Sequence, residues 1–155
     1  MELVEATEDD AGTLVEYWFS LASGMEQYSR FNELVYDGAD EVPGDAFRDH
    51  FERDDIRDYL VEVDGETVGF LTLAEGTHPS REFGRYTKLV NLFVAAEHRN
   101  RGYGTEAIER AKGLAKERGC DHLKVSCEWG NAAARRLYRE TGFEEKQVTF
   151  VQELG

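Results

Sequence analysis

Residues 89–115 read LVNLFVAAEHRNRGYGTEAIERAKGLA, and this stretch decides the fold. Five of its first six residues are apolar, which at this length predicts a buried strand over 89–94. A turn with two glycines follows, and apolar residues then recur at helical spacing. The helical positions are Ala107, Ile108, Ala111, Leu114 and Ala115. The stretch therefore predicts a strand, a glycine turn and a helix in direct succession.

The turn, Arg99–Thr105, has the features of an anion-binding site. The first turn of a helix carries backbone N–H groups without intrahelical partners, and the helix dipole adds partial positive charge there. Gly102 and Gly104 lack a Cβ, so a phosphate can approach the main chain closely. Arg99 and Arg101 add guanidinium groups, whose forked donors suit phosphate oxygens. A pyrophosphate is the ligand that this arrangement favours.

The rest of the chain predicts a mixed α/β fold. Helices are expected at about 8–23, 105–118 and 131–141, and a further one is signalled by Pro43-Gly44-Asp45 with Phe47, His50 and Phe51 on one face. Strands are expected at 3–6, 59–63, 67–73, 89–94, 123–127 and 143–154. Asp64-Gly65 is a two-residue hairpin signal, so part of the sheet is antiparallel, whereas the later helices are crossovers that make another part parallel. We expect a single domain, residues 1–155, with a central sheet of six to seven strands and about four helices.

The charge of the chain is strongly negative and unevenly distributed. The net charge is −14, and only five of the eighteen basic residues are lysine. Residues 1–77 carry 21 acids and 4 bases, net −17, whereas residues 78–155 carry 11 acids and 14 bases, net +3. The acidity argues against nucleic acid or an anionic membrane as a partner. Abundant acids with few lysines also suggest a halophilic source as a hypothesis.

Neither a membrane segment nor a metal site is expected. No apolar run approaches the length of a membrane helix, and the acidic start MELVEATEDD is unlike a secretion signal, so we expect a cytoplasmic protein. Cys120 and Cys127 are the only cysteines, and the four histidines are scattered. These residues form no metal-ligand pattern.

Two motifs resemble those of a known family. The turn is neither G-x-G-x-x-G nor G-x-x-x-x-G-K-[ST], but it matches R-x-x-G-x-G through Arg99, Gly102 and Gly104. A second segment reads N-x-x-A-x-x-L-Y-x-x-x-G-F over residues 131–143. Both motifs, in this order, resemble the GNAT superfamily of acetyl-CoA-dependent N-acetyltransferases. The predicted order of strands and helices is also similar to that of the family.

The resemblance implies transfer of an acetyl group from acetyl-CoA to a primary amine by direct attack in a ternary complex. It implies that the turn holds the pyrophosphate and that backbone groups of Phe93 and Val94 pair with the pantetheine arm. It also implies that an N–H near Phe93 faces the oxyanion and that the phenol of Tyr138 donates to the departing sulfur. Asn131 would contact the arm or cap its helix. The residues assigned to acetyl-CoA are Leu92, Phe93, Val94, Arg99, Asn100, Arg101, Gly102, Tyr103, Gly104, Thr105, Asn131 and Tyr138.

The general base is the point where the chain departs from the family. Many relatives place a carboxylate in the fourth strand, where this chain has Val90 and Asn91. Asn91 is retained as a catalytic candidate because its carboxamide can orient a water. Glu128 and Glu33 are alternative bases, and a mechanism without a base, in which bulk water accepts the proton, is a further one.

The acceptor is expected to be a small-molecule or peptide amine, and no motif identifies it. The main competing hypothesis is a catalytically silent acyl-CoA sensor with the same fold. A regulatory partner protein without a ligand is the third, and it leaves the basic glycine turn unexplained. The oligomeric state is open, with a homodimer as one option because dimers are common among relatives.

Overall fold

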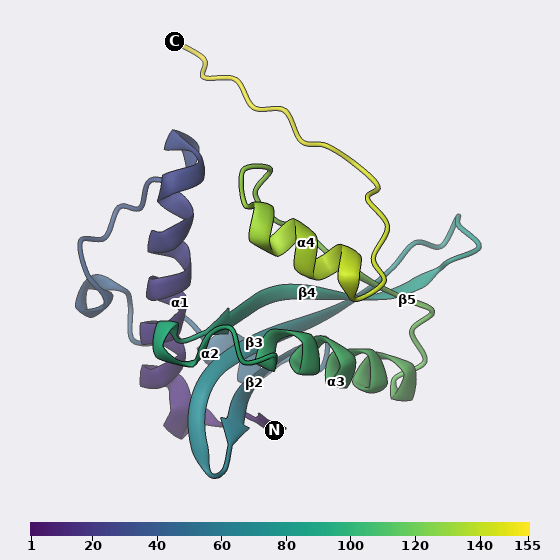
Figure 1. The fold of residues 1–155 in the computed structure, drawn as a ribbon, viewed down its shortest axis with the longest axis horizontal. Coiled ribbons are helices and arrows are strands. Elements are labelled where there is room, and N and C mark those ends of the chain that lie inside the picture. Colours follow the sequence, from purple (N-terminus) through teal and green to yellow (C-terminus); the bar gives the residue numbers. More distant parts are fainter.

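The computed structural model describes all 155 residues as one sheet with helices on both faces (Figure 1). The strands are β1 (Glu2–Glu5), β2 (Ile56–Val63), β3 (Glu66–Thr77), β4 (Arg85–Val94) and β5 (His122–Val125). The helices are α1 (Ala11–Met25), α2 (Arg48–Phe51), α3 (Tyr103–Glu117) and α4 (Ala132–Glu140). Short 3-10 turns lie at Glu8–Asp10, Glu26–Tyr28, Arg30–Asn32, Ala39–Glu41 and Ala96–His98.

The strands lie side by side in the order β1-β2-β3-β4-β5. The first three pairings are antiparallel, and β4 and β5 are parallel with α3 as the crossover between them. The turn between β2 and β3 has positive φ at both Asp64 (52°) and Gly65 (81°), the geometry that a two-residue hairpin with the strand twist requires. The mixed α/β fold and the hairpin predicted from sequence are therefore confirmed.

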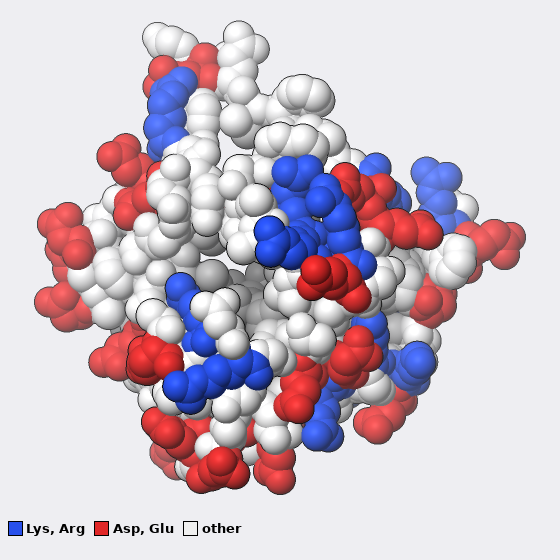
Figure 2. All heavy atoms as spheres, viewed as in Figure 1, with Lys and Arg blue, Asp and Glu red and all other residues white.

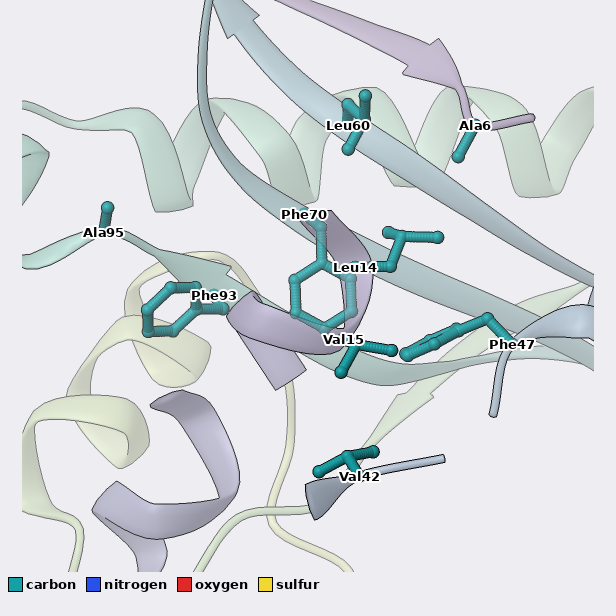
Figure 3. Close-up of a cluster of buried hydrophobic side chains, with 9 residues drawn as sticks. All are labelled: Ala6, Leu14, Val15, Val42, Phe47, Leu60, Phe70, Phe93 and Ala95. Atoms are coloured by element: carbon teal, nitrogen blue, oxygen red, sulfur yellow. The ribbon is translucent and has the colours of Figure 1, made fainter. Parts of the chain in front are cut away.

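Alternation along the central strands divides the core into two clusters. Leu60, Phe70 and Phe93 point to the face that α1 covers, where they pack with Leu14 and Val15 (Figure 3). The opposite face carries Tyr59, Leu71, Leu73 and Leu89, which pack on Ala107, Ile108 and Ala111 of α3. Because successive residues of a strand face opposite sides, β2, β3 and β4 bury apolar side chains on both faces and form the centre of the core.

Two expectations about elements are wrong. The segment 143–154 was expected to be a strand, but it lies outside the sheet, which has five strands instead of six or seven. Its apolar alternation suits a strand, but no neighbouring backbone accepts or donates to residues 144–155. The first helix also continues through Gly24 to Met25. A helical glycine costs only about 1 kcal/mol relative to alanine, and the packing of α1 outweighs that cost.

None of the helices combines the length and the apolar character needed to cross a lipid bilayer.

Candidate functional site

The edge of β4 loses its neighbour part-way along the strand. β4 pairs with β5 only from Tyr86 to Leu89. The register with β3 then shifts, because Thr72 lies opposite Asn91 whereas Leu73 lies opposite Leu89, so Val90 is an extra, bulged residue. From Asn91 onward β4 pairs with β3 alone. The bulge therefore marks the start of an open strand edge between β4 and β5.

The backbone groups on this open edge belong to Leu92 and Val94. The N–H of Ala95 donates to the carbonyl of Val68 at 2.8 Å, and the carbonyl of Phe93 occupies the space where a side chain at Gly69 would lie. Residues 93 and 95 thus point to β3, so the expectation that the Phe93 backbone pairs with the arm and faces the oxyanion is wrong. Since backbone groups alternate along a strand, those of residues 92 and 94 point to the open side.

The predicted glycine turn connects this edge to α3 and leaves a row of free donors. Asn100 (φ 63°) and Gly102 (φ 84°) take left-handed conformations, the second of which suits glycine because it has no Cβ. The first hydrogen bond of the helix runs from Glu106 N to Gly102 O at 3.0 Å. The six N–H groups from Asn100 to Thr105 have no acceptor within the chain, and no side chain caps α3. They form an open cradle for an anion.

Basic side chains border this cradle. In Figure 2, Lys and Arg gather over α4 and over the loop before α3, on either side of a hollow, whereas acidic residues dominate the periphery. Arg101 is exposed and forms no ion pair. Arg99 turns back onto β4: its Nε donates to the carbonyl of Val94 at 2.8 Å, and its guanidinium lies 5.4 Å from the ring of Phe93. On α4 the basic residues are Arg135, Arg136 and Arg139.

α4 brings the second motif to the same region. The Asn131 side chain accepts from the N–H of Ala134 at 3.0 Å and so caps the helix. Tyr138 packs edge-on against Phe143 at 5.6 Å and contacts the α3 side of the core. Burial, with a smaller contribution from Cys127, raises the pKa of Tyr138 to about 12. Its hydroxyl is therefore protonated at neutral pH, and it has no hydrogen-bond partner within the chain.

A polar row crosses the α1 face of the sheet and ends at Asn91. The Asn91 amide donates to the Thr72 hydroxyl at 3.1 Å, and Thr72 donates to Asp58 at 2.5 Å. The other carboxylate oxygen of Asp58 lies 2.7 Å from Nδ1 of His50 on α2. Asp58 is 3% exposed and Thr72 is 0% exposed. The row joins three segments of the chain, α2, β2 and β3, to β4.

The acceptor oxygens of Asp58 set the direction of the hydrogen bonds in this row. A carboxylate only accepts, so the single proton of the Thr72 hydroxyl points to Asp58. Thr72 can then only accept from its other neighbour, which must present an N–H group. The NH₂ of Asn91 therefore faces Thr72, and its carbonyl oxygen stays free to accept a hydrogen bond elsewhere.

The other candidate bases lie in different places. Glu128 accepts from the side chain of Asn32 at 2.5 Å, and this contact links the segment after α1 to the loop before α4. Glu33 is exposed and forms no ion pair. His50, Asp58 and Thr72 were not among the residues predicted for the site. The alternation along β2 could have indicated Asp58, because it places this carboxyl on the same buried face of the strand as Leu60.

The sequence also matches a described family. The profile of the acetyltransferase (GNAT) family matches residues 21–143. The chain belongs to this family. The predicted superfamily and the predicted kind of enzyme, an acetyltransferase, are thereby confirmed.

Relatives and solved structures agree with this membership. An uncharacterized N-acetyltransferase of Archaeoglobus fulgidus is 30% identical over 89% of each chain. Another, from Methanocaldococcus jannaschii, is 28% identical over 92% of this chain, which spans only 60% of that relative's length. A tetramutant of the BH1408 protein of Bacillus halodurans has the same fold, with a TM-score of 0.85 at 15% identity over 99% of this chain and 100% of that one.

Proposed function

We propose that this protein transfers the acetyl group of acetyl-CoA to a primary amine, with both substrates bound at once. The observation that carries the proposal is the row of six unpartnered N–H groups at the start of α3, next to a strand edge that has lost its neighbour. A diphosphate fits the first feature, and an extended amide-bearing arm fits the second. The pantetheine diphosphate of CoA contains both groups in the matching order.

The residues that would bind CoA lie in the C-terminal half of the chain, whose net charge is +3. The cradle from Asn100 to Thr105 would receive the pyrophosphate, with Arg101 and the α4 arginines supplying positive charge. The free backbone groups of Leu92 and Val94 would pair with the pantetheine amides. Arg99 already donates to the carbonyl of Val94 at 2.8 Å, and the second lone pair of that oxygen remains free to accept from the arm.

The chemistry follows from the open edge. The lone pair of a neutral amine attacks the thioester carbon, the carbonyl electrons move to oxygen, and collapse of this intermediate breaks the C–S bond. An N–H of Leu92 or Val94 would stabilise the oxyanion. Tyr138 would hydrogen-bond the leaving thiolate. With a pKa of about 12 its phenol is roughly three units less acidic than an ordinary thiol, so it acts as a hydrogen-bond donor and keeps its proton.

Asn91 is the residue that we assign to the acceptor side. Its free carbonyl oxygen, directed by Thr72 and Asp58, would hold the attacking amine or a water that removes the amine proton. A carboxamide is too weak a base to keep that proton, which therefore passes to solvent. This assignment accounts for the absence of a carboxylate in β4.

The acceptor is proposed to be a cationic small molecule or peptide amine. The segment after α1 approaches the loop before α4, through the Asn32–Glu128 contact and through Tyr28, which leaves only 3.3 Å to a side chain built at Gly130. This segment lies in the part of the chain whose net charge is −17. A negative rim attracts a protonated amine and raises its local concentration.

The direct test is CoA binding, measured by calorimetry, in Gly104→Glu and Gly113→Glu. Both glycines lie in α3, and both changes add the same charge to the same helix. Gly104 contributes its N–H to the cradle, and a Cβ there would meet only Leu137 at 3.5 Å, whereas Gly113 is exposed with nothing within 4 Å. We expect the Gly104 variant to lose CoA binding and the Gly113 variant to keep it. Equal affinity in two folded variants would contradict the assignment of the cradle.

Turnover is tested by thiol release from acetyl-CoA with a panel of amines. Release that depends on an amine supports the transferase. Tight CoA binding without turnover on any amine would favour the silent sensor instead.

A further inference from the structure

The polar row that ends at Asn91 contains one buried carboxyl group, that of Asp58. Its side chain is 0% exposed, and each of its two oxygens has one neighbour: the hydroxyl of Thr72 at 2.5 Å and Nδ1 of His50 at 2.7 Å. The only ion pair available to this carboxyl group is the one with His50. Because a charged carboxylate is costly in a protein interior unless donors surround it, the ionised form of Asp58 depends on these two neighbours.

The proton count of Asp58 decides which way the row runs. An ionised Asp58 only accepts, so Thr72 donates to it and the NH₂ of Asn91 faces Thr72. A protonated Asp58 can instead donate to Thr72, which then donates to the carbonyl oxygen of Asn91. Both directions fit the same positions of the heavy atoms. Only the first leaves the Asn91 carbonyl free for the acceptor amine.

His50 is placed to select the first direction. It lies on α2, where its ring packs edge-on against the buried ring of Phe47 at 5.3 Å. This contact holds Nδ1 toward Asp58. Since an ionised carboxyl group cannot donate, Nδ1 must carry the hydrogen of this bond. The imidazole therefore stabilises the charged form of Asp58 at the oxygen that Thr72 does not reach.

The other charged side chains around His50 do not replace it. His50 and Asp58 border a cleft of about 430 Å³ between β1, α2 and the start of β2. The remaining charged residues of this cleft are Glu5, Glu8, Arg53, Asp54 and Arg57. Arg53 pairs with Asp49 and Asp55, and Arg57 pairs with Glu5. On the side of the sheet, Thr72 and Asn91 are uncharged. His50 is thus the one donor that the cleft supplies to Asp58.

We propose that His50 is a positioning residue for acetyl transfer: by donating to Asp58 it keeps that carboxyl group ionised and so directs the Asn91 carbonyl to the acceptor amine. The proposal rests on the proposed role of Asn91. His50 reaches Asn91 only through Asp58 and Thr72, by three successive hydrogen bonds. No proton moves along the row during the reaction, and the amine proton still passes to solvent.

The kinetic test compares His50→Leu with His50→Asn. Leucine cannot donate, whereas asparagine places an amide N–H close to the position of Nδ1. In His50→Leu we expect kcat/KM for the amine to fall roughly three- to tenfold while the KM for acetyl-CoA stays the same, and His50→Asn should restore most of the loss. His122→Leu is the matched control and should keep full activity, because Nδ1 of His122 pairs with Asp121 at 2.6 Å, outside the row.

A second measurement does not depend on turnover. The side-chain NH₂ of Asn91 is hydrogen-bonded to Thr72 only in the direction that an ionised Asp58 imposes. Its hydrogen exchange, followed by NMR in ¹⁵N-labelled protein, should therefore be slow in the wild type, in His50→Asn and in His122→Leu. In His50→Leu we expect the exchange to be severalfold faster.

Three results would overturn the proposal. The first is an unchanged kcat/KM in a folded His50→Leu variant, and the second is equal exchange of the Asn91 NH₂ in that variant and in the wild type. The third is a further loss when His50→Leu is added to Asn91→Ala, because His50 would then act through another group. If the wild type acetylates no amine, the proposed function fails, and the exchange measurement alone still decides whether His50 directs Asn91.

Discussion

Replacing Thr72 by valine tests whether the polar row acts through Asn91. The side chains have nearly the same shape, but valine removes the hydroxyl that accepts from Asn91 and donates to Asp58. Hydrogen bonds to charged groups contribute about 1.5–3 kcal/mol, so we expect a loss of about 2 kcal/mol of stability. For a domain of this length that lowers the Tm by roughly 4–8 °C.

Thr72→Val should also lower catalysis, because the Asn91 carboxamide loses the hydrogen bond that orients it. Without Thr72, nothing selects the orientation in which the Asn91 oxygen faces the acceptor. Losing one hydrogen bond of about 1.4 kcal/mol at that position corresponds to a roughly tenfold lower kcat/KM for the amine. The KM for acetyl-CoA should stay the same, because the row does not touch the cradle at α3.

The assay is steady-state acetyl transfer in Thr72→Val, Asn91→Ala and the double variant. If Thr72 acts only through Asn91, adding Thr72→Val to Asn91→Ala lowers kcat/KM no further. Thr87→Val is the matched control, since Thr87 is equally buried (2% exposed) but points to the α3 face and bonds only Cys120. Additive losses in the double variant, or full activity in a destabilised Thr72→Val, would refute the reasoning.

Two further predictions concern the leaving group and the charge. Tyr138→Phe should lower kcat by roughly one to two orders of magnitude, because the donor to the leaving thiolate is lost. The affinity for CoA should stay within about twofold. An unchanged kcat would remove Tyr138 from the mechanism. We also propose that the net charge of −14 reflects a salty environment. The Tm should then rise steeply with molar KCl, and indifference to KCl would end the halophilic hypothesis.

Much of the fold was predictable because its signals are local. The Asp64-Gly65 turn, the glycine at the start of α3 and the Asn131 cap each depend on the φ angles or hydrogen bonds of a few neighbouring residues. The two motifs identified the family for the same reason, since each lies within one turn and its helix.

The remaining features depend on register between distant segments. Thr72 meets Asn91, and Asp58 meets Thr72, only because β2, β3 and β4 pair in one particular alignment. A shift of one residue would send each side chain to the opposite face. The sequence alone therefore suggested Asn91 as a candidate without showing what directs it.

The C-terminal segment after α4 likewise separates what the sequence predicts from what the assembled sheet decides. Apolar alternation in residues 143–154 is enough to predict extended backbone, because that pattern depends only on which residues can face one side of a strand. Whether a neighbour exists is a property of the assembled sheet, and β5 is at its edge with this segment directed away. By itself the sequence indicated the acetyltransferase family, the glycine turn at the start of α3 and most of the elements around it. Only the tertiary structure decided which strand edges stay unpaired and which polar side chains meet, because both depend on how segments far apart in the chain align.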